Sequence, residues 1–273
     1  MKRARRSMLP RDESGYRARR VRGATFFTSR RAFDDLTIVV KRFPRRADGT
    51  GPDFVLVHGI GVSSRYYQPA AAELAKLGTV YLVDLPGYGA APNPRRDVSI
   101  ADHAGVLAKF LASSNLPKPV LVGHSMGSQV VSRLAVDSPE VTDHIVLMAP
   151  TMPPKERSSL WPGAWRLVVD GLWNPPWANV IVATDYFFRC GIPYFLQQCP
   201  HLLGDRIEDR LPQVTAKTLV LGGDHDLVVP VEWARTVASL VPGATFRTVK
   251  GPHLVMFSDP VGVATAITEH AST

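Results

Sequence analysis

The feature that most constrains the fold is a regular alternation of short apolar runs with segments of helical periodicity. The apolar runs are rich in Val, Ile and Leu and lie at Asp53–His58, Thr79–Asp84, 119–122, Asp143–Met148, Lys217–Gly222 and Thr245–Val249. The helical segments are Tyr67–Leu77, Ile100–Ser113, Gln129–Val136, Val231–Val241 and Pro260–Glu269. Continuous apolar runs are typical of strands that are covered on both faces. The alternation therefore predicts an α/β fold with a mostly parallel central sheet and helices on both faces.

Two segments depart from this alternation. Thr25–Thr28 and Leu36–Arg42, joined by a polar turn at Asp34-Asp35, predict a hairpin that forms an antiparallel edge. Between Pro150 and Leu211 the chain holds four of its five tryptophans but no buried strand, which predicts an insertion with a small structure of its own. We therefore divide the chain into a basic N-terminal extension (1–22), a first core part (23–150), a helical cap insertion (151–211) and a second core part (212–273).

Charge is distributed unevenly along the 273 residues. Residues 1–46 hold 15 Lys and Arg against 4 Asp and Glu, whereas the remaining 227 hold 17 against 20. The basic character thus belongs to the extension and the first strands. We expect the extension to be a solvated tail with at most a weak contact to a membrane surface, and no nucleic acid partner is expected. The extension lacks the apolar segment of a secretory signal, and no run of 18 apolar residues predicts a transmembrane segment.

The two cysteines, Cys190 and Cys199, are too few for a disulfide framework. Together with the missing signal and membrane segments, they lead us to expect a cytoplasmic protein. The oligomeric state is left open by the sequence.

A serine lies at the point where a strand must turn sharply into a helix. Gly123-His124-Ser125-Met126-Gly127 joins the strand at 119–122 to the helix that follows. Such a turn needs small neighbours, but folding alone does not require a serine at its apex. At the carboxyl end of a parallel strand, Ser125 would face the edge where ligands bind, beside the positive end of a helix dipole. A nucleophilic serine also needs a base and a carboxylate that orients the base.

Both partners follow later strands, and the chain order of serine, acid and histidine is the one expected for this architecture. His253 lies in the loop after Thr245–Val249, and Gly251-Pro252 precede it. Asp224 and Asp226 both follow the strand at Lys217–Gly222, and on the residues alone either one is a candidate for the acid.

Four motifs in register give the chain a resemblance to the α/β-hydrolase fold superfamily. They are the nucleophile turn Gly-x-Ser-x-Gly at 123–127, His-Gly-x-Gly at 58–61, Asp-x-x-Gly-x-Gly at 84–89 and Gly-x-x-Asp-x-x-x-Pro at 223–230. The similarity runs from about Phe54 to Ala266, and the insertion falls where the family carries its cap.

The resemblance implies a set of functional residues. It implies a triad of Ser125, Asp226 and His253, with Asp224 left as a neighbour of the acid. It also implies an oxyanion hole made by the backbone amides of Ile60 and Met126, and a helix start suits the negative charge that such a hole binds. Of the other polar residues in the motifs, we expect Asp84 to brace its glycine-rich loop, His58 to stabilise its own loop and His124 to flank the turn.

Aromatic residues of the insertion are candidates for an apolar substrate pocket. Trp161 and Trp165 are four residues apart, as are Trp173 and Trp177, so each pair shares one helical face. We name Trp161, Trp165 and Phe187 as pocket candidates, although these side chains equally suit the core of the cap. No metal site and no cofactor are expected, since the histidine and cysteine spacings fit no metal motif and the glycines fit no nucleotide loop.

The leading functional hypothesis is serine hydrolysis of a carboxylic ester of a hydrophobic small molecule, through an acyl-enzyme. The same resemblance leaves three alternatives open, because C–C bond hydrolases of dienone acids, thioesterases and perhydrolases share this arrangement of serine, acid and histidine. Many C–C hydrolases carry Asn before the serine, where this chain has His124, and they need a cation for the substrate carboxylate, for which Arg157, Arg166 and Arg189 are available. The third hypothesis, a non-catalytic binding protein on this fold, is disfavoured because all three triad residues are present.

Overall fold

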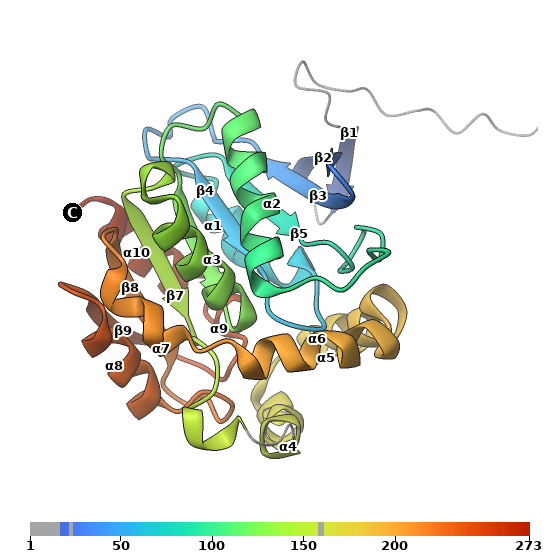
Figure 1. Cartoon of the computed structure of the whole chain (residues 1–273). Helices are drawn as coiled ribbons and strands as arrows, with labels where there is room; N and C mark the ends of the chain where they lie inside the picture. Colours follow the sequence, from blue (N-terminus) through green and yellow to red (C-terminus); the bar gives the residue numbers. More distant parts are fainter. Residues whose placement is uncertain (1–16, 22–23, 158–160) are drawn as a thin grey trace, which may run out of the picture.

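The computed structural model describes residues 17–21, 24–157 and 161–273 (Figure 1). In these residues nine strands form one sheet, in the order β1-β2-β3-β5-β4-β6-β7-β8-β9. The strands are β1 (Arg17–Val21), β2 (Ala24–Phe33), β3 (Leu36–Phe43), β4 (Phe54–Val57), β5 (Val80–Asp84), β6 (Val120–His124), β7 (His144–Met148), β8 (Lys217–Gly223) and β9 (Thr245–Val249).

The predicted mostly parallel sheet with an antiparallel edge is confirmed. Strands β5, β4, β6, β7, β8 and β9 are parallel neighbours, while β1, β2 and β3 are antiparallel. The antiparallel edge is larger than predicted, because β1 comes from residues assigned to the basic extension and pairs along β2 from Arg17↔Thr28 to Val21↔Ala24. Its sequence, RARRV, has no apolar run, so backbone pairing rather than a buried side-chain pattern makes it a strand.

The α-helices are α1 (Gln68–Leu74), α2 (Ile100–Ser113), α3 (Met126–Asp137), α4 (Trp161–Asp170), α5 (Pro176–Asp185), α6 (Ile192–Gly204), α7 (Ile207–Arg210), α8 (Val231–Leu240), α9 (Val255–Ser258) and α10 (Pro260–Ala271). Shorter helical turns are η1 (Ser64–Tyr67), η2 (Pro139–Val141), η3 (Pro154–Glu156), η4 (Gly171–Trp173), η5 (Tyr186–Cys190) and η6 (Leu211–Gln213). The helix predicted at Tyr67–Leu77 is thus split between η1 and a shorter α1, and α3 begins three residues before its predicted start.

Two apolar cores lie on opposite faces of the sheet. Helices α2, α3 and α8 pack on one face and α1, α9 and α10 on the other (Figure 1). Successive side chains of a strand point to opposite faces, so Val55 and Val57 of β4 join the first core while Phe54 and Leu56 join the second. This division explains why the central strands are apolar at every position.

Residues 151–211, which we call the cap segment, lie between β7 and β8 and include α4 to α7. Three of its side chains reach loops at the carboxyl ends of the parallel strands. Asp185 accepts hydrogen bonds from Ser63, Tyr186 donates to the Ile60 carbonyl, and Tyr194 donates to the Pro86 carbonyl. In the described residues, no helix combines the length and apolar character that a membrane crossing requires.

Candidate active site

Ser125 occupies a strained turn between β6 and α3. Its φ and ψ are 52° and −118°, a region that residues with a side chain rarely adopt and that costs about 1–3 kcal/mol. The backbone crowds both flanks: a Cβ on Gly123 would lie 2.2 Å from the Gly127 carbonyl oxygen, and one on Gly127 would lie 2.3 Å from the Val57 oxygen. The Ser125 amide is fixed by donating to the Met148 carbonyl at 2.9 Å. The turn therefore needs glycine on both sides and keeps the serine partly exposed.

Asp226 and His253 form a buried pair beside this turn. The carboxylate Oδ2 of Asp226 accepts a hydrogen bond from His253 Nδ1 at 2.9 Å, and both residues are at most 6% exposed. Its other oxygen accepts from the amides of Val228 and Val229, each at 2.8 Å. A carboxylate only accepts hydrogen bonds, so Nδ1 of His253 carries the proton and Nε2 is left with a lone pair. The structure brings Asp226, rather than Asp224, to the histidine.

Asp224 has a different task. Its Oδ1 accepts from the Gly251 amide at 2.8 Å and lies 2.7 Å from His225 Nδ1. Asp224 thus joins the loop after β8 to the loop that precedes His253, without touching the imidazole of His253.

The charges around His253 favour its protonated form. Burial by itself lowers the pKa of His253, but the charge and hydrogen bond of Asp226, together with the nearby Asp170 carboxylate, raise the pKa above its usual value. A base with a pKa near neutral pH is suited to taking a proton and giving it back. Among the described residues the Ser125 hydroxyl has no hydrogen-bond partner; such contacts are often long before substrate binds.

His124, expected only to flank the turn, connects the two halves of the site. Its Nε2 lies 3.1 Å from the His253 carbonyl oxygen, and its Nδ1 lies 2.9 Å from the Tyr66 hydroxyl. The carbonyl requires a donor, so Nε2 carries the proton and Nδ1 accepts from Tyr66. Tyr66 in turn accepts from the Gly59 amide at 2.9 Å. Burial, followed by the neighbouring His253, lowers the pKa of His124 well below its usual value, so the ring stays neutral in this chain of hydrogen bonds.

The loop that carries Ile60 passes against the serine. A Cβ on Gly59 would lie 3.2 Å from the Ser125 Cβ. His58 orients this loop, because its Nδ1 donates to the Gly59 carbonyl at 2.7 Å while its Nε2 accepts from the Leu85 amide at 3.1 Å. In a trans peptide the carbonyl and the following N–H point in opposite directions, so the bond to the Gly59 carbonyl fixes the direction of the Ile60 N–H.

The second amide expected in the oxyanion hole belongs to Met126, the first residue of α3. The first N–H groups of a helix have no acceptor within the helix and carry partial positive charge. The Met126 amide is thus suited to an anion beside Ser125.

A buried ion pair braces the glycine-rich loop after β5. Asp84 accepts from Lys41 Nζ at 2.7 and 2.9 Å, from the amide and hydroxyl of Ser64, and from the Ala90 amide. Burial alone would raise the pKa of Asp84, but the Lys41 charge and these hydrogen bonds bring it down to about 2. The predicted bracing role fits these contacts, since every bond of Asp84 runs to the surrounding framework.

Asp170 of the cap segment is a carboxylate that the sequence did not single out. It is fully buried and accepts from the His253 amide at 3.0 and 3.1 Å and from the Leu227 amide at 3.2 Å. One cap carboxylate therefore holds both the loop of the base and the loop of its acid. Burial raises the pKa of Asp170, opposed by the charge of His253. No motif marks this residue; the available signal was an acid within the stretch 161–204, which holds only one other, Asp185.

The pocket candidates lie elsewhere than expected. The side chains of Trp165 and Phe187 are 68% and 62% exposed, which does not fit the lining of an enclosed apolar pocket. The inner side of α5 instead carries the buried residues Ala178 and Asp185, so the aromatic faces point outward. The side chain of Trp161 lies outside the described part of the structure.

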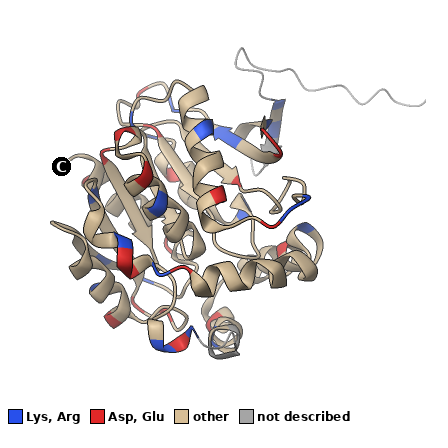
Figure 2. Ribbon diagram, viewed as in Figure 1, with Lys and Arg blue, Asp and Glu red and all other residues tan. Residues whose placement is uncertain are grey.

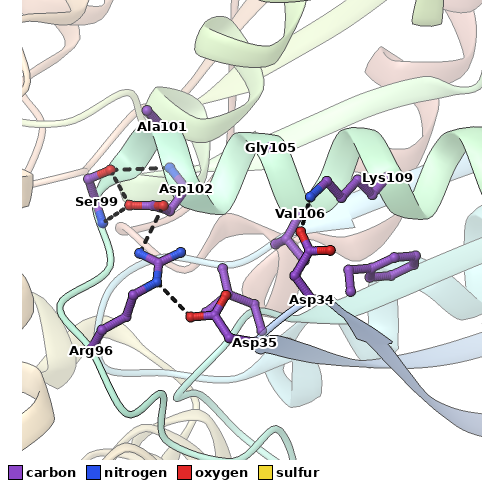
Figure 3. Close-up of a pocket in the computed structure, with 11 residues that line it drawn as sticks. Asp34, Asp35, Arg96, Ser99, Ala101, Asp102, Gly105, Val106 and Lys109 are labelled. Carbon is purple, nitrogen blue, oxygen red and sulfur yellow. Dashed lines mark hydrogen bonds and ion pairs between the residues drawn. The ribbon is translucent and has the colours of Figure 1, made fainter.

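A cavity of about 270 Å³ lies away from the serine, between α2 and the turn that joins β2 to β3 (Figure 3). Its charges neutralise one another, since Arg96 pairs with Asp35 and Asp102, and Lys109 pairs with Asp34. None of the candidate site residues described above lines it. The ion pairs fasten the hairpin turn to α2, which is a structural task.

Comparison with known proteins agrees with this architecture. Residues 54–266 match the model of a family described as alpha/beta hydrolase family. The chain belongs to the alpha/beta hydrolase family. The matched residues run from β4 into α10.

Individual relatives align with different shares of this chain. An uncharacterised protein of Mycobacterium tuberculosis is 35% identical over 104 residues, but these cover only 38% of this chain and 30% of the relative. The pimeloyl-[acyl-carrier protein] methyl ester esterase of Aeromonas salmonicida is 31% identical over 235 residues, covering 77% of this chain and 84% of the esterase. The crystal structure of an enol-lactonase from Burkholderia xenovorans LB400 superposes with a TM-score of 0.75 at 17% identity, covering 90% and 100% of the two chains, and shares the fold.

Proposed function

We propose that this protein cleaves a carboxylic ester of a hydrophobic small molecule through an acyl-enzyme on Ser125. The observation that carries the proposal is the buried Asp226–His253 pair, which leaves His253 Nε2 as a lone-pair base. The His253 ring lies 4.6 Å from the ring of His124, the residue before Ser125 in its strained turn. A relative over most of the chain is named as a methyl ester esterase, which supports the same bond type. We further propose that residues 151–211 act as the cap of the site, with residues 23–150 and 212–273 as the core.

In the proposed reaction, His253 Nε2 takes the proton of Ser125 as its hydroxyl oxygen attacks the ester carbonyl. The negative charge that develops on the carbonyl oxygen is received by the amides of Ile60 and Met126, each such donor being worth roughly 3 kcal/mol in other hydrolases. The imidazolium, stabilised by Asp226, gives its proton to the leaving alcohol. Water then attacks the acyl-enzyme by the same route, and Ser125 regains its proton from His253.

The alternatives with the same triad differ in the bond that is cleaved. A C–C hydrolase of dienone acids needs a cation for the substrate carboxylate. The three arginines considered for this task are each paired with an acid: Arg157 with Glu208 at 2.6 Å, Arg166 with Glu156, and Arg189 with Asp185 at 3.5 Å. These pairs favour a neutral substrate, and so favour the ester over the dienone acid.

Labelling with a fluorophosphonate, followed by peptide mass spectrometry, tests the nucleophile. We expect one phosphonylated residue, Ser125, and loss of the label in Ser125→Ala and in His253→Ala. Ser128 provides a matched control, since its hydroxyl is buried and already donates to the Gly123 carbonyl; Ser128→Ala should keep the label. Labelling at another residue, or labelling that persists in His253→Ala, would overturn the proposed triad.

A panel of substrates then separates the bond types. We expect turnover of uncharged esters to exceed that of matched thioesters and dienone acids by at least tenfold in kcat/KM. A preference for the dienone acid would replace ester hydrolysis by the C–C alternative.

A cytoplasmic location stays a prediction from the sequence.

A further inference from the structure

The outer surface of the cap segment is apolar to a degree unusual for a solvent-facing side of a protein. Six large side chains from α4, η4, α5 and η5 are between 62% and 84% exposed, and we call them the outer cap face: Trp165, Leu172, Trp173, Trp177, Phe187 and Phe188. Scattered single apolar residues are ordinary on a surface, but a succession from four consecutive elements is typical of an interaction site.

The spacing of two of these residues places them on one side of a helix. Trp177 lies in α5 and Phe188 in η5, which continues α5 directly; they are eleven residues apart, which is close to three helical turns. Trp173 belongs to the preceding turn η4, which the extended residues Asn174 and Pro175 separate from α5. The buried Ala178 and Asp185 show that a neighbouring side of the same helix, about a quarter of a turn from Trp177, is directed inward. The outer cap face is therefore directed away from the core, and no other element of the described residues covers it.

The charges of this segment identify the kind of partner. Residues 161–204 contain only two carboxylates, Asp170 and Asp185, and both are fully buried in the joint between cap and core. The partly exposed charges of the same residues are Arg166, which pairs with Glu156, and Arg189, which lies 3.5 Å from Asp185. Asp185 also pairs with Arg65, so one carboxylate faces two arginines and a net positive charge is left beside η5. Figure 2 shows helices α5 and α6 with few charged residues of either sign.

An apolar surface rich in Trp and Phe, bordered by arginine and free of exposed acids, has the chemistry of a lipid interface. Indole and phenyl rings settle at the boundary between headgroups and acyl chains, and basic side chains are attracted to anionic headgroups. A protein partner would usually be met by a more polar rim with hydrogen-bonding groups. The N-terminal 46 residues, with 15 basic against 4 acidic residues, add a second attraction for the same surface.

We propose that the outer cap face docks this protein on an anionic lipid surface. Aromatic insertion supplies the part of the affinity that does not depend on salt, and the basic residues supply a part that salt weakens. Lipid docking stands independently of the serine chemistry above, because it requires only the exposed face and the charges.

Vesicle co-sedimentation of the full-length chain tests the proposal. We compare vesicles of phosphatidylcholine alone with vesicles that contain equal parts of phosphatidylglycerol, each at low and at high salt. The test variant is Trp173→Ser/Trp177→Ser/Phe188→Ser, which changes only exposed side chains. The matched control is Val261→Ser on α10, since Val261 is 58% exposed but lies outside the cap. Circular dichroism and turnover of a water-soluble ester verify that both variants are folded.

We expect the unchanged protein and Val261→Ser to bind the anionic vesicles, and the triple variant to lose at least tenfold in partition coefficient. Four of the five tryptophans lie in the cap, so brominated lipid should quench much of the intrinsic fluorescence on binding. Failure of the unchanged protein to sediment with the vesicles, or equal binding by the triple variant, would overturn the proposal. Equal binding to phosphatidylcholine alone would refute the anionic preference. A dimer that the triple variant dissociates, without lipid binding, would assign the face to a second copy of the chain.

Discussion

Substitution of Asp170 tests whether the cap segment holds His253, the proposed base, in place. Its carboxylate accepts hydrogen bonds from the backbone amides of His253 and Leu227. Alanine and asparagine at this position separate the hydrogen bonds from the charge. Asp170→Ala leaves both buried amides without this acceptor. Asp170→Asn keeps one oxygen for them. Asn174 Nδ2 donates to Asp170 Oδ2 at 3.2 Å, so in this variant the Asn174 amide must turn over for its Oδ1, which is buried without a partner among the described residues, to accept from the new NH₂ group.

The magnitude follows from these contacts. A buried amide that loses its acceptor costs about 1–3 kcal/mol, so Asp170→Ala should lower the free energy of unfolding by about 2–6 kcal/mol. If about 2 kcal/mol of this cost appears as misplacement of His253 in the transition state, kcat/KM falls roughly 30-fold. In Asp170→Asn the loss of activity should be smaller. Because Asp170 helps to raise the pKa of His253, removing its charge should move the acid limb of kcat/KM to lower pH.

The assay is kcat/KM for a water-soluble ester, followed by pH-stat from pH 5 to 9, together with urea unfolding of each variant. Asp185→Ala is the matched control, because Asp185 is equally buried in the cap but binds Ser63 and Arg65. This control should lose stability yet leave the acid limb unmoved. Wild-type kcat/KM in Asp170→Ala, combined with an unmoved acid limb in Asp170→Asn, would refute the assignment of Asp170 as a positioning residue.

Three further outcomes follow from the site. Asp226→Asn should lower kcat by roughly 10⁴-fold in a steady-state ester assay, because the amide no longer fixes the Nδ1–H tautomer of His253; a loss below tenfold would contradict the assigned pair. In the unchanged protein, the acid limb of kcat/KM should have its midpoint above pH 6.5, since the pKa of His253 is raised; a midpoint below 6.5 would contradict this. Burial lowers the pKa of His103 to about 4, so the unfolded state binds its proton first as the pH falls from 6.5 to 4, and stability should decline by on the order of 3 kcal/mol over that window. Urea unfolding at pH 7 and at pH 4.5 measures this decline. Between these two pH values His103→Gln should lose less free energy of unfolding than the unchanged protein, and an equal loss would show that other groups cause the acid destabilisation.

The sequence predicted most of the central sheet because the central strands are buried on both faces and therefore apolar throughout. The same logic placed Ser125, Asp226 and His253 at strand ends, where the structure has them. Strand β1 escaped prediction because Arg17–Val21 is held by pairing with β2, and its arginines carry no apolar pattern. The start of α3 was placed late for a related reason, since Met126 to Ser128 are dictated by the turn rather than by helical periodicity.

The contacts that position the site were not predictable from local pattern. Asp170 and His253 are 83 positions apart, and Tyr66 and His124 are 58 positions apart. Such bonds depend on how loops from separate elements meet, and neither partner lies in a motif that marks the pairing. The outward direction of Trp165 and Phe187 has the same origin, because helical periodicity shows that residues share a face but does not show which face meets the core.

The two buried carboxylates of the cap connect its outer surface to the chemistry of the site. Asp170 binds the loop of His253, and Asp185 binds Ser63 in the segment that follows Ile60. The cap is thus fastened on the side of the base and on the side of the expected oxyanion amide. In residues 161–204 Asp170 and Asp185 are the only acids and both are directed inward, which leaves aromatic residues for the outer surface and reverses the usual arrangement of a surface helix. These two carboxylates thus connect the segment that carries the outer cap face to loops on both sides of Ser125.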